Sequence, residues 1–433
     1  MDDLLARRPP RITGHPEGEP LVRATDHDTV ARACELVTRL DETTLCIQGP
    51  PGTGKTYTAA AMIAELLRSG ARVGITAQSH KVIMNAMRAV AKALAARGVT
   101  APLLKVGDHE DDPLVEEGTI QVIVNEDVPG VLADGACLVG GTAWLFSREE
   151  LVGGFQYLFI DEAGQYSLAN AVAVGQAARN LVLVGDQMQL AQVTKGSHPG
   201  ETGLSCLEYL LAGNPTVPQH LGLFLPESRR MHPDVCRFVS DAVYEGRLGT
   251  IPETARHRVL RSPATSLVPA ETGIVWVPVE HHGCDQKSDE ECEKIVAITE
   301  ELLGRRVVDR HGVERDMTVS DILVVTPFNL QVRCLREKLP PGIEVGSVDK
   351  FQGQEAPVVI VSLCSSTLEE APRGASFLLN PNRLNVALSR AEALAIVVGC
   401  PELMEVRCRS VEEMRLVNLL CHLVQYAEEQ AAR

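Results

Sequence analysis

The sequence predicts an α/β fold with two domains, each built on a parallel sheet covered by helices. With 433 residues the chain exceeds what one hydrophobic core usually spans. Short apolar runs alternate with segments of helix length, the pattern of parallel sheets. The composition breaks at 212–222, where two prolines and two glycines fall within eleven residues. We therefore expect a loose lead-in at 1–23, one domain at 24–215 and another at 216–433.

In the first domain an apolar run beginning at Thr44 predicts a strand, and more strands are expected at 71–77, 136–140, 157–160 and 180–185. Helices are expected at 56–69, with Gly70 just past its end, at 81–97 and near 168–179. Residues 99–135 mix Pro, Gly and acidic residues around one β-like run at 119–124. This segment predicts a small insertion in the first domain.

The second domain repeats this alternation without a phosphate loop of its own. Strands are expected at 274–279, 322–326, 357–363 and 394–399, and helices at 289–303 and 330–339. Apolar residues at helical spacing over 411–427 predict a C-terminal helix that packs on this domain.

Composition restricts the class of protein. The formal net charge of −16 argues against a generally basic surface, so any polynucleotide would be held in a local groove. No apolar run approaches the roughly 20 residues of a membrane span, and the first residues lack a signal-peptide core. The sequence thus predicts a cytoplasmic protein without a membrane partner.

Twelve cysteines are scattered through the chain and none forms a C-x-x-C pair, which favours buried reduced thiols. His281, His282, Cys284 and Cys292 form the nearest approach to a metal cluster. Their spacing fits no standard zinc pattern.

A phosphate-binding loop follows the first strand. The sequence matches G-x-x-x-x-G-K-[ST], in which backbone N–H groups cradle phosphates, the lysine reaches the β- and γ-phosphates and the hydroxyl holds Mg²⁺. Because the loop follows a strand and opens a helix, the helix N-terminus also favours a bound anion. The expected nucleotide-binding residues are Gly49, Pro50, Pro51, Gly52, Thr53, Gly54, Lys55 and Thr56.

Polar side chains end the next strands of the first domain. Asp161 and Glu162 follow an apolar run, and behind a phosphate loop such a pair would orient Mg²⁺ and polarise the attacking water. The alternative is that Asp161 and Glu162 are ordinary solvated acids at the end of a strand. Gln189 follows the strand at 180–185 and would sense a γ-phosphate or position water, unless it only forms a turn.

Six motifs in a fixed order carry a resemblance to a known family. The chain resembles superfamily 1 helicases of the up-frameshift and senataxin group, from about residue 26 to 400, and is similar to the helicase half of bacterial RecB-like nuclease–helicase proteins. The motifs are Gly49 to Thr56, Asp161-Glu-Ala-Gly-Gln165, Gly185-Asp-Gln-Met-Gln-Leu190, Arg230-Met-His-Pro233, Val348-Asp-Lys-Phe-Gln-Gly353 and Arg383-Leu-Asn-Val-Ala-Leu-Ser-Arg390.

The resemblance implies two RecA-like P-loop NTPase domains with an ATP cleft between them. Lys55 and Thr56 would bind the phosphates and Mg²⁺, Asp161 the metal, Glu162 the catalytic water and Gln189 the γ-phosphate.

In the second domain, the resemblance makes Arg230 and Arg390 arginine fingers that stabilise charge on the transferred phosphoryl group. Glu355 would contact the ribose, and Arg229 stands where an aromatic residue often stacks on the base. The usual upstream glutamine that reads adenine is missing, since Asp26, His27 and Asp28 occupy that region. Base selectivity is therefore open, although an arginine plane stacks on a purine.

The resemblance also implies a track for a nucleic acid strand through hydroxyl and amide groups, which contact phosphate and sugar without reading sequence. The alternative for each of these residues is a structural role, either as a helix cap or within a turn. Aromatic residues are only 4% of the chain, which argues against a long base-stacking platform. The implied strand contacts are Ser79, His80, Thr142, Thr326, Ser347 and Gln352.

The expected function is an ATP- and Mg²⁺-dependent helicase or translocase on single-stranded DNA or RNA, with 5′-to-3′ movement from the resemblance and a possible nuclease or loading partner. A nucleotide-controlled clamp or scaffold is the main alternative, and a small-molecule kinase is a third. The segment 99–135 is too short for the accessory barrel usual in this group. Its acidic residues, among them Asp108, Glu110 and Asp112, are expected to repel a phosphate backbone.

Overall fold

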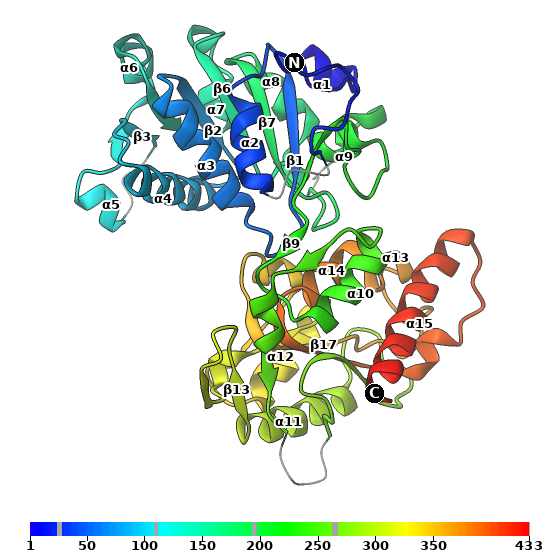
Figure 1. Cartoon of the computed structure of the whole chain (residues 1–433). Coiled ribbons are helices and arrows are strands. Elements are labelled where there is room, and N and C mark those ends of the chain that lie inside the picture. The colour runs from blue at the N-terminus through cyan, green and yellow to red at the C-terminus, as the bar shows by residue number, and fades with distance from the viewer. Residues whose placement is uncertain (24–27, 108–110, 193–195, 197, 262–266, 433) are drawn as a thin grey trace. The chain divides into compact units, whose positions relative to one another are not determined.

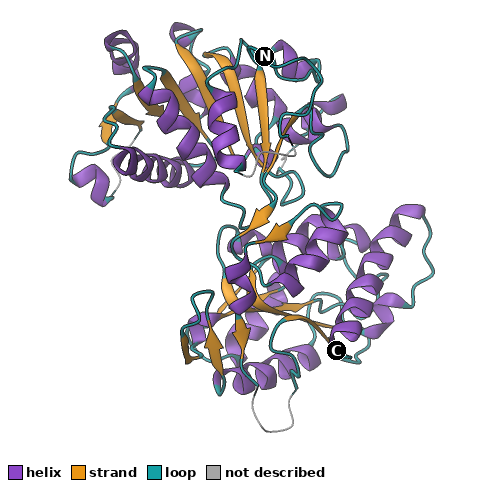
Figure 2. Ribbon diagram, viewed as in Figure 1, coloured by secondary structure: helices purple, strands orange, loops and turns teal. Residues whose placement is uncertain are grey.

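The computed structural model describes residues 1–433 except 24–27, 108–110, 193–195, 197, 262–266 and 433. Contacts divide the chain into two compact units. The first comprises Met1–Pro50, Gly54–Gln187 and Ala191–Leu225, and the second Pro51–Thr53, Met188–Leu190 and Pro226–Arg433. Each unit contains a parallel sheet with helices around it, so the predicted α/β fold class is confirmed (Figures 1 and 2).

The first unit is built on an eight-stranded sheet in the order β4-β3-β5-β2-β6-β7-β1-β8. All neighbouring strands in this sheet are parallel. Its strands are β1 (Thr44–Gln48), β2 (Arg72–Thr76), β3 (Leu103–Val106), β4 (Gln121–Ile123), β5 (Cys137–Gly140), β6 (Phe155–Asp161), β7 (Ala178–Gly185) and β8 (Gly222–Phe224).

The α-helices of the first unit include both long helices that the sequence predicts, and Gly70, with φ of +89°, follows the end of α3 as expected. The predicted helix near 168–179 ends earlier, because β7 already begins at Ala178. The helices are α1 (Asp2–Leu5), α2 (Thr29–Val37), α3 (Lys55–Arg68), α4 (His80–Arg97), α5 (Pro113–Glu116), α6 (Val128–Asp134), α7 (Ala143–Phe146), α8 (Leu168–Gly175) and α9 (Cys206–Leu211).

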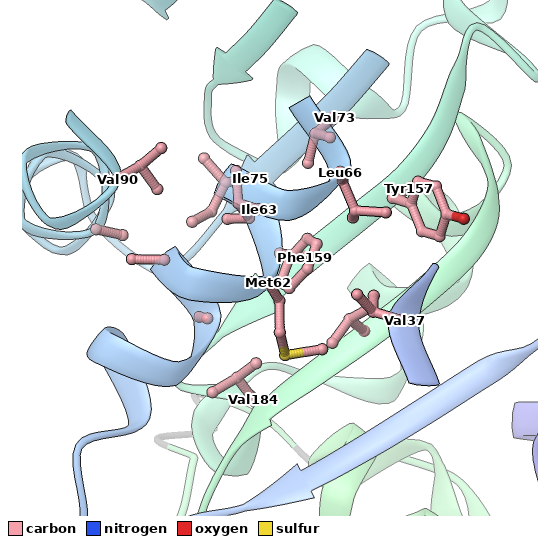
Figure 3. Packing of buried hydrophobic residues seen from close by; sticks show 14 of the residues in the cluster. Val37, Met62, Ile63, Leu66, Val73, Ile75, Val90, Tyr157, Phe159 and Val184 are labelled. Carbon is pink, nitrogen blue, oxygen red and sulfur yellow. The ribbon is translucent and has the colours of Figure 1, made fainter. Parts of the chain in front are cut away.

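The core of the first unit lies between the sheet and α2, α3 and α4 (Figure 3). Met62 and Leu66 of α3 pack among Ile75 of β2 and Phe159 of β6, and all four are buried. Burial of apolar area at about 25 cal/mol per Å² is the main force holding this layer. It fixes the start of α3, and therefore the phosphate loop, against the sheet.

Residues 1–23, expected to form a loose lead-in, pack on the first unit instead. Ile12 and Leu21 join its core, and the buried carboxylate of Asp3 accepts a hydrogen bond from the Thr43 hydroxyl at 2.7 Å. The Leu21 N–H donates to the carbonyl of Gln219 at 2.8 Å. The prolines that suggested a loose segment only prevent regular secondary structure here.

Two other boundaries differ from the sequence prediction. The segment 99–135 is not a separate insertion, because β3 and β4 extend the parallel sheet at its edge. The first unit also continues past the expected boundary at 215, since β8 pairs with β1 and unit 1 ends at Leu225. A three-residue strand leaves no clear local signal, so the proline-rich turn before it looked like the boundary.

The second unit contains a five-stranded parallel sheet in the order β12-β18-β17-β15-β16. A small antiparallel sheet, β11-β13-β14, and the pair β10-β9 complete its strands. The bounds are β9 (Glu227–Ser228), β10 (Gly249–Thr250), β11 (Arg258–Val259), β12 (Gly273–Pro278), β13 (Arg306–Val308), β14 (Glu314–Asp316), β15 (Ile322–Val325), β16 (Glu344–Gly346), β17 (Ala356–Ser362) and β18 (Ala391–Gly399).

The predicted helices of the second unit are present, and α11 has the predicted bounds because Ser288 caps it, its side chain accepting from the Glu291 N–H. The C-terminal helix α15 contacts β12, as expected for a helix that packs on this unit. The α-helices are α10 (Pro233–Val243), α11 (Asp289–Leu303), α12 (Asn329–Lys338), α13 (Ala375–Leu378), α14 (Pro381–Leu388) and α15 (Val411–Ala431). Within the described ranges, no helix combines the length and apolar character that a membrane span requires.

Candidate functional site

The phosphate loop joins β1 to α3 in the conformation that glycine permits. Gly52 and Gly54 have φ values of +76° and +82°, a region that other residues adopt only with strain. Gly54 caps α3, which begins at Lys55. The Lys55 ammonium donates a hydrogen bond to the carbonyl of Gly49 at 2.7 Å, so it folds over the loop. Backbone N–H groups at the start of this 14-residue helix, together with that ammonium, suit a bound anion.

Asp161 and Glu162 lie at the end of β6, in the same unit as Lys55. Burial raises the pKa of the Asp161 carboxyl to about 7, and the charge of Glu162 adds to this shift while that of Lys55 opposes it. A buried carboxylate so placed gains from a nearby cation. Glu162 has φ of +52°, an uncommon conformation for glutamate that often marks functional positions. Both acids therefore differ from ordinary solvated residues at a strand end.

Glycines allow the turns after β6 and β7 to meet. A Cβ atom on Gly164 would lie 2.4 Å from the carbonyl oxygen of Asp186, and one on Gly185 would lie 2.7 Å from the N atom of Ala163. Such distances leave no room for a methyl group. The approach brings the Asp161–Glu162 turn beside the segment that leads to Gln189, whose side chain is buried.

We expect Gly164→Ala to lower the free energy of unfolding by about 1–3 kcal/mol, because the new methyl group meets backbone that must move. Urea unfolding followed by circular dichroism measures this change. Gly130→Ala in α6 is the matched control, since open space surrounds its added methyl group and alanine favours helix. Equal stabilities of the Gly164→Ala and unsubstituted proteins would contradict the tight approach of the two turns.

In the second unit, the two predicted arginine fingers and Glu355 form one cluster. The Arg230 guanidinium donates to the Glu355 carboxylate at 2.5 Å and to the carbonyl of Ser389 at 3.1 Å. Arg390 is 2% exposed and donates to the carbonyls of Val386 and Gln354 at 3.0 and 3.2 Å. Arg229, which precedes Arg230 in the chain, is exposed.

Glu392 is a member of this neighbourhood that the sequence reasoning missed. Burial raises the pKa of its carboxyl to about 7, the Glu355 charge acts in the same direction, and Arg230 and Arg310 oppose the shift. Its carboxylate lies 3.8 Å from the Nδ1 atom of His257. The only local signal is its position two residues after Arg390.

The predicted strand contacts divide into exposed and buried residues. In the first unit Ser79 and His80 are exposed and Thr142 is half-buried, and the Ser79 hydroxyl caps α4 by accepting from the Val82 N–H. In the second unit Ser347 and Gln352 are half-buried. Thr326 is 0% exposed, and its N–H donates to the carbonyl of Gly346 in β16. Its side chain therefore has no surface to offer a strand in this structure.

One acid of the acidic segment, Asp112, is paired within the first unit. Asp112 is 1% exposed, accepts from the Arg88 Nε at 2.5 Å and caps α5. Its charge is thus neutralised within the unit, because Arg88 of α4 lies against it. Asp108 and Glu110, named with it as repulsive, lie outside the described residues, as do Asp26 and His27 upstream of the phosphate loop.

His281, considered as a metal ligand, belongs to a buried network instead. Its ring lies 3.1 Å from the Glu291 carboxylate and 2.8 Å from the Ser366 hydroxyl. Glu291 also accepts from the Ser362 hydroxyl and the Cys364 N–H. These bonds fix the loop after β17. Over the described ranges, no group of three potential metal-ligating side chains comes together.

Two family models match the chain, both described as an AAA domain, one over residues 30–201 and the other over 204–402. Among curated proteins, the chain is 25% identical to the DNA replication ATP-dependent helicase/nuclease dna2 of Schizosaccharomyces pombe, over 88% of this chain and 28% of that protein. It is 26% identical to the DNA-binding protein SMUBP-2 of Mesocricetus auratus, over 81% of this chain and 40% of that protein. The chain thus spans well under half the length of these relatives.

Among solved structures, the helicase nonstructural protein 10 of an arterivirus is similar with a TM-score of 0.45 and 16% identity, over 82% of this chain and 59% of that one. The two α/β units and the phosphate loop define the class, a P-loop NTPase. The family matches and relatives confirm the resemblance drawn from the sequence, which is to superfamily 1 helicases of the up-frameshift and senataxin, or DNA2-like, group. The likeness to RecB-like nuclease–helicase proteins stays a prediction.

Proposed function

We propose that this chain is an ATP-driven motor that moves along single-stranded DNA or RNA and separates strands. The observation that carries the proposal is the phosphate loop opening α3 in the same unit as the Asp161–Glu162 pair. Relatives named as helicases support it. Movement from 5′ to 3′ and a cytoplasmic location are further parts of the proposal.

The loop N–H groups and Lys55 bind the β- and γ-phosphates of ATP, and the positive φ values of the loop glycines and the folded ammonium fit that ligand. Thr56 and Asp161 would hold Mg²⁺, which would neutralise charge on the phosphates. The raised pKa of Asp161 fits this role, because a cation relieves the cost of burying its charge. Glu162 accepts a proton from the attacking water and Gln189 senses the γ-phosphate.

In the second unit, Arg230 and Arg390 stabilise the negative charge that spreads over the phosphoryl oxygens during transfer. Arg229 stacks on the base and Glu355 binds the ribose. The ion pair between Arg230 and Glu355 must open for both residues to reach the nucleotide. Glu355 is 50% exposed, so exchanging this pair for contacts with ATP costs little.

The strand lies along residues with polar side chains and contacts them mainly through phosphate and sugar. Ser79, His80 and Thr142 serve the first unit, and Ser347 and Gln352 the second. Thr326 would contribute only after a change in the surrounding structure, because its side chain is buried. The name of one relative combines helicase and nuclease, which supports the proposal of a nuclease partner.

A nucleotide-controlled clamp that never separates strands is the second candidate, and the net charge of −16 favours it. ATP hydrolysis measured with and without oligo(dT) or oligo(U) separates the two functions. A motor is expected to hydrolyse ATP many times faster with a strand present. Hydrolysis that neither DNA nor RNA changes, with binding to neither, would refute the motor.

A further inference from the structure

The first unit carries a tryptophan in full contact with solvent. Trp144 is 86% exposed, more than any other large apolar residue described, although the chain has only two tryptophans. Isolated exposed apolar residues are common. Tryptophan, however, has the largest apolar surface that a side chain can bury, and here that surface stays in water. A ligand that covers Trp144 would explain its position.

Trp144 is held by a rigid support. It lies in α7, whose next two residues, Leu145 and Phe146, are buried. Gly74 and Gly141 let these anchors approach: a Cβ on Gly74 would lie 2.7 Å from the Phe146 ring, and one on Gly141 would lie 2.5 Å from Leu145. The anchors fix the helix on the sheet, so the point from which the indole extends into solvent is fixed as well.

The support stands at the ligand-binding edge of a parallel sheet. α7 follows the carboxyl end of β5, and β5 pairs with β2, whose carboxyl end leads to Ser79 and His80. The Gly141 N–H donates to the Ile75 carbonyl at 3.1 Å, which joins the two strand ends. Ligands of open α/β sheets bind at the carboxyl ends of strands. Neighbouring strands lie about 4.8 Å apart, so groups from β2 and β5 meet adjacent parts of one ligand.

The surrounding chemistry favours a nucleic acid over a protein partner. Ser79, His80 and Lys81 are exposed and Thr142 is half-buried, so the residues that follow β2 and β5 offer polar and basic groups. A protein interface has an apolar centre, whereas a nucleic acid needs polar or basic groups for phosphate and a flat aromatic for a base.

We propose that Trp144 stacks on a base of the single strand that this chain binds, beside the phosphate contacts of Ser79, His80 and Thr142. This inference rests on the proposed strand-binding function and adds a residue to it. Every base has a π-face, so the contact grips the strand without reading its sequence. Aromatic residues are 4% of the chain, which argues against a long row of stacked bases.

Tryptophan fluorescence tests this contact. In a Trp276→Phe protein, Trp144 is the single tryptophan, and its emission is expected to fall when oligo(dT) or oligo(U) binds. By anisotropy of labelled strands, Trp144→Ala in the same background should weaken binding about tenfold, in line with the cost of losing one base stack. Trp144→Phe should keep most of the affinity, whereas Trp144→Leu, apolar but not aromatic, should lose it.

The outcomes separate this inference from the function on which it rests. Strand binding with unchanged Trp144 emission and an unchanged Kd in Trp144→Ala would overturn the stacking contact, leave the motor intact and point to a protein partner on this surface. Binding of neither DNA nor RNA to the unsubstituted chain would overturn both. If Trp144→Ala loses its thermal unfolding transition, the emission of the Trp276→Phe protein alone decides.

Discussion

Lys55→Ala is expected to abolish ATP hydrolysis and to weaken ATP binding, whereas Glu162→Gln should keep ATP bound and stop turnover. In the proposed mechanism, the lysine contacts phosphates in the ground state, while the glutamate acts on the attacking water only as the reaction proceeds. The Lys55 ammonium donates to the Gly49 carbonyl, a bond within the phosphate loop, so its removal should leave the rest of the fold intact. Steady-state hydrolysis and equilibrium binding of a fluorescent ATP analogue measure the two effects.

Glu162→Gln is a close control for Lys55→Ala because it removes one charge and changes little else. The backbone at Glu162, with φ of +52°, accepts glutamine as readily as glutamate. Equal losses of ATP affinity in the two variants would contradict the separate roles. Retained hydrolysis in Lys55→Ala would remove the phosphate loop from the mechanism altogether.

Arg230→Ala should lower turnover by roughly 10³-fold or more, with a much smaller change in ATP affinity, because a finger acts mainly on the charge of the transition state. Its hydrogen-bonding partner Glu355 is 50% exposed, so the loss of this ion pair leaves the Glu355 carboxylate in contact with water. Comparison of kcat with ATP affinity at saturating strand concentration measures the effect. Glu355→Gln is the matched control, and we expect it to change nucleotide binding more than turnover.

Arg390→Ala is a less direct test of the same mechanism. Arg390 is buried and holds the carbonyls of Val386 and Gln354, so its loss should lower both turnover and melting temperature. Normal ATP hydrolysis by Arg230→Ala would exclude an arginine finger at that position. Normal ATP hydrolysis by a folded Arg390→Ala protein would exclude Arg390 as the other finger.

Local sequence patterns predicted the parts of the fold that local chemistry determines. The strand, loop and helix from Thr44 through Lys55, and the bounds of α11, follow from apolar periodicity, glycines and a capping serine. The sequence pattern indicates Asp161 and Glu162 because the two residues end an apolar run. No sequence pattern indicates the positive φ of Glu162, since the same residues occur in relaxed turns.

Contacts between distant residues could not be predicted in the same way. Arg230 and Glu355 are 125 residues apart, and no pattern in either motif indicates that the two form an ion pair. Asp112 looked like a repulsive surface charge because its partner, Arg88, is 24 residues away in the chain, with β3 between them. Trp144 was counted with the few aromatic residues, and only its surroundings in the fold show that it is exposed.

The pairing of β8 with β1 has a practical consequence for anyone who wants the first unit alone. A fragment that stops at residue 215 would lack β8 and would turn β1, now between β7 and β8, into an open edge. Open, apolar edge strands recruit other chains and aggregate. The buried side chains of Leu45 and Ile47 make β1 especially prone to such association. Soluble expression should therefore require that the fragment extend through Leu225.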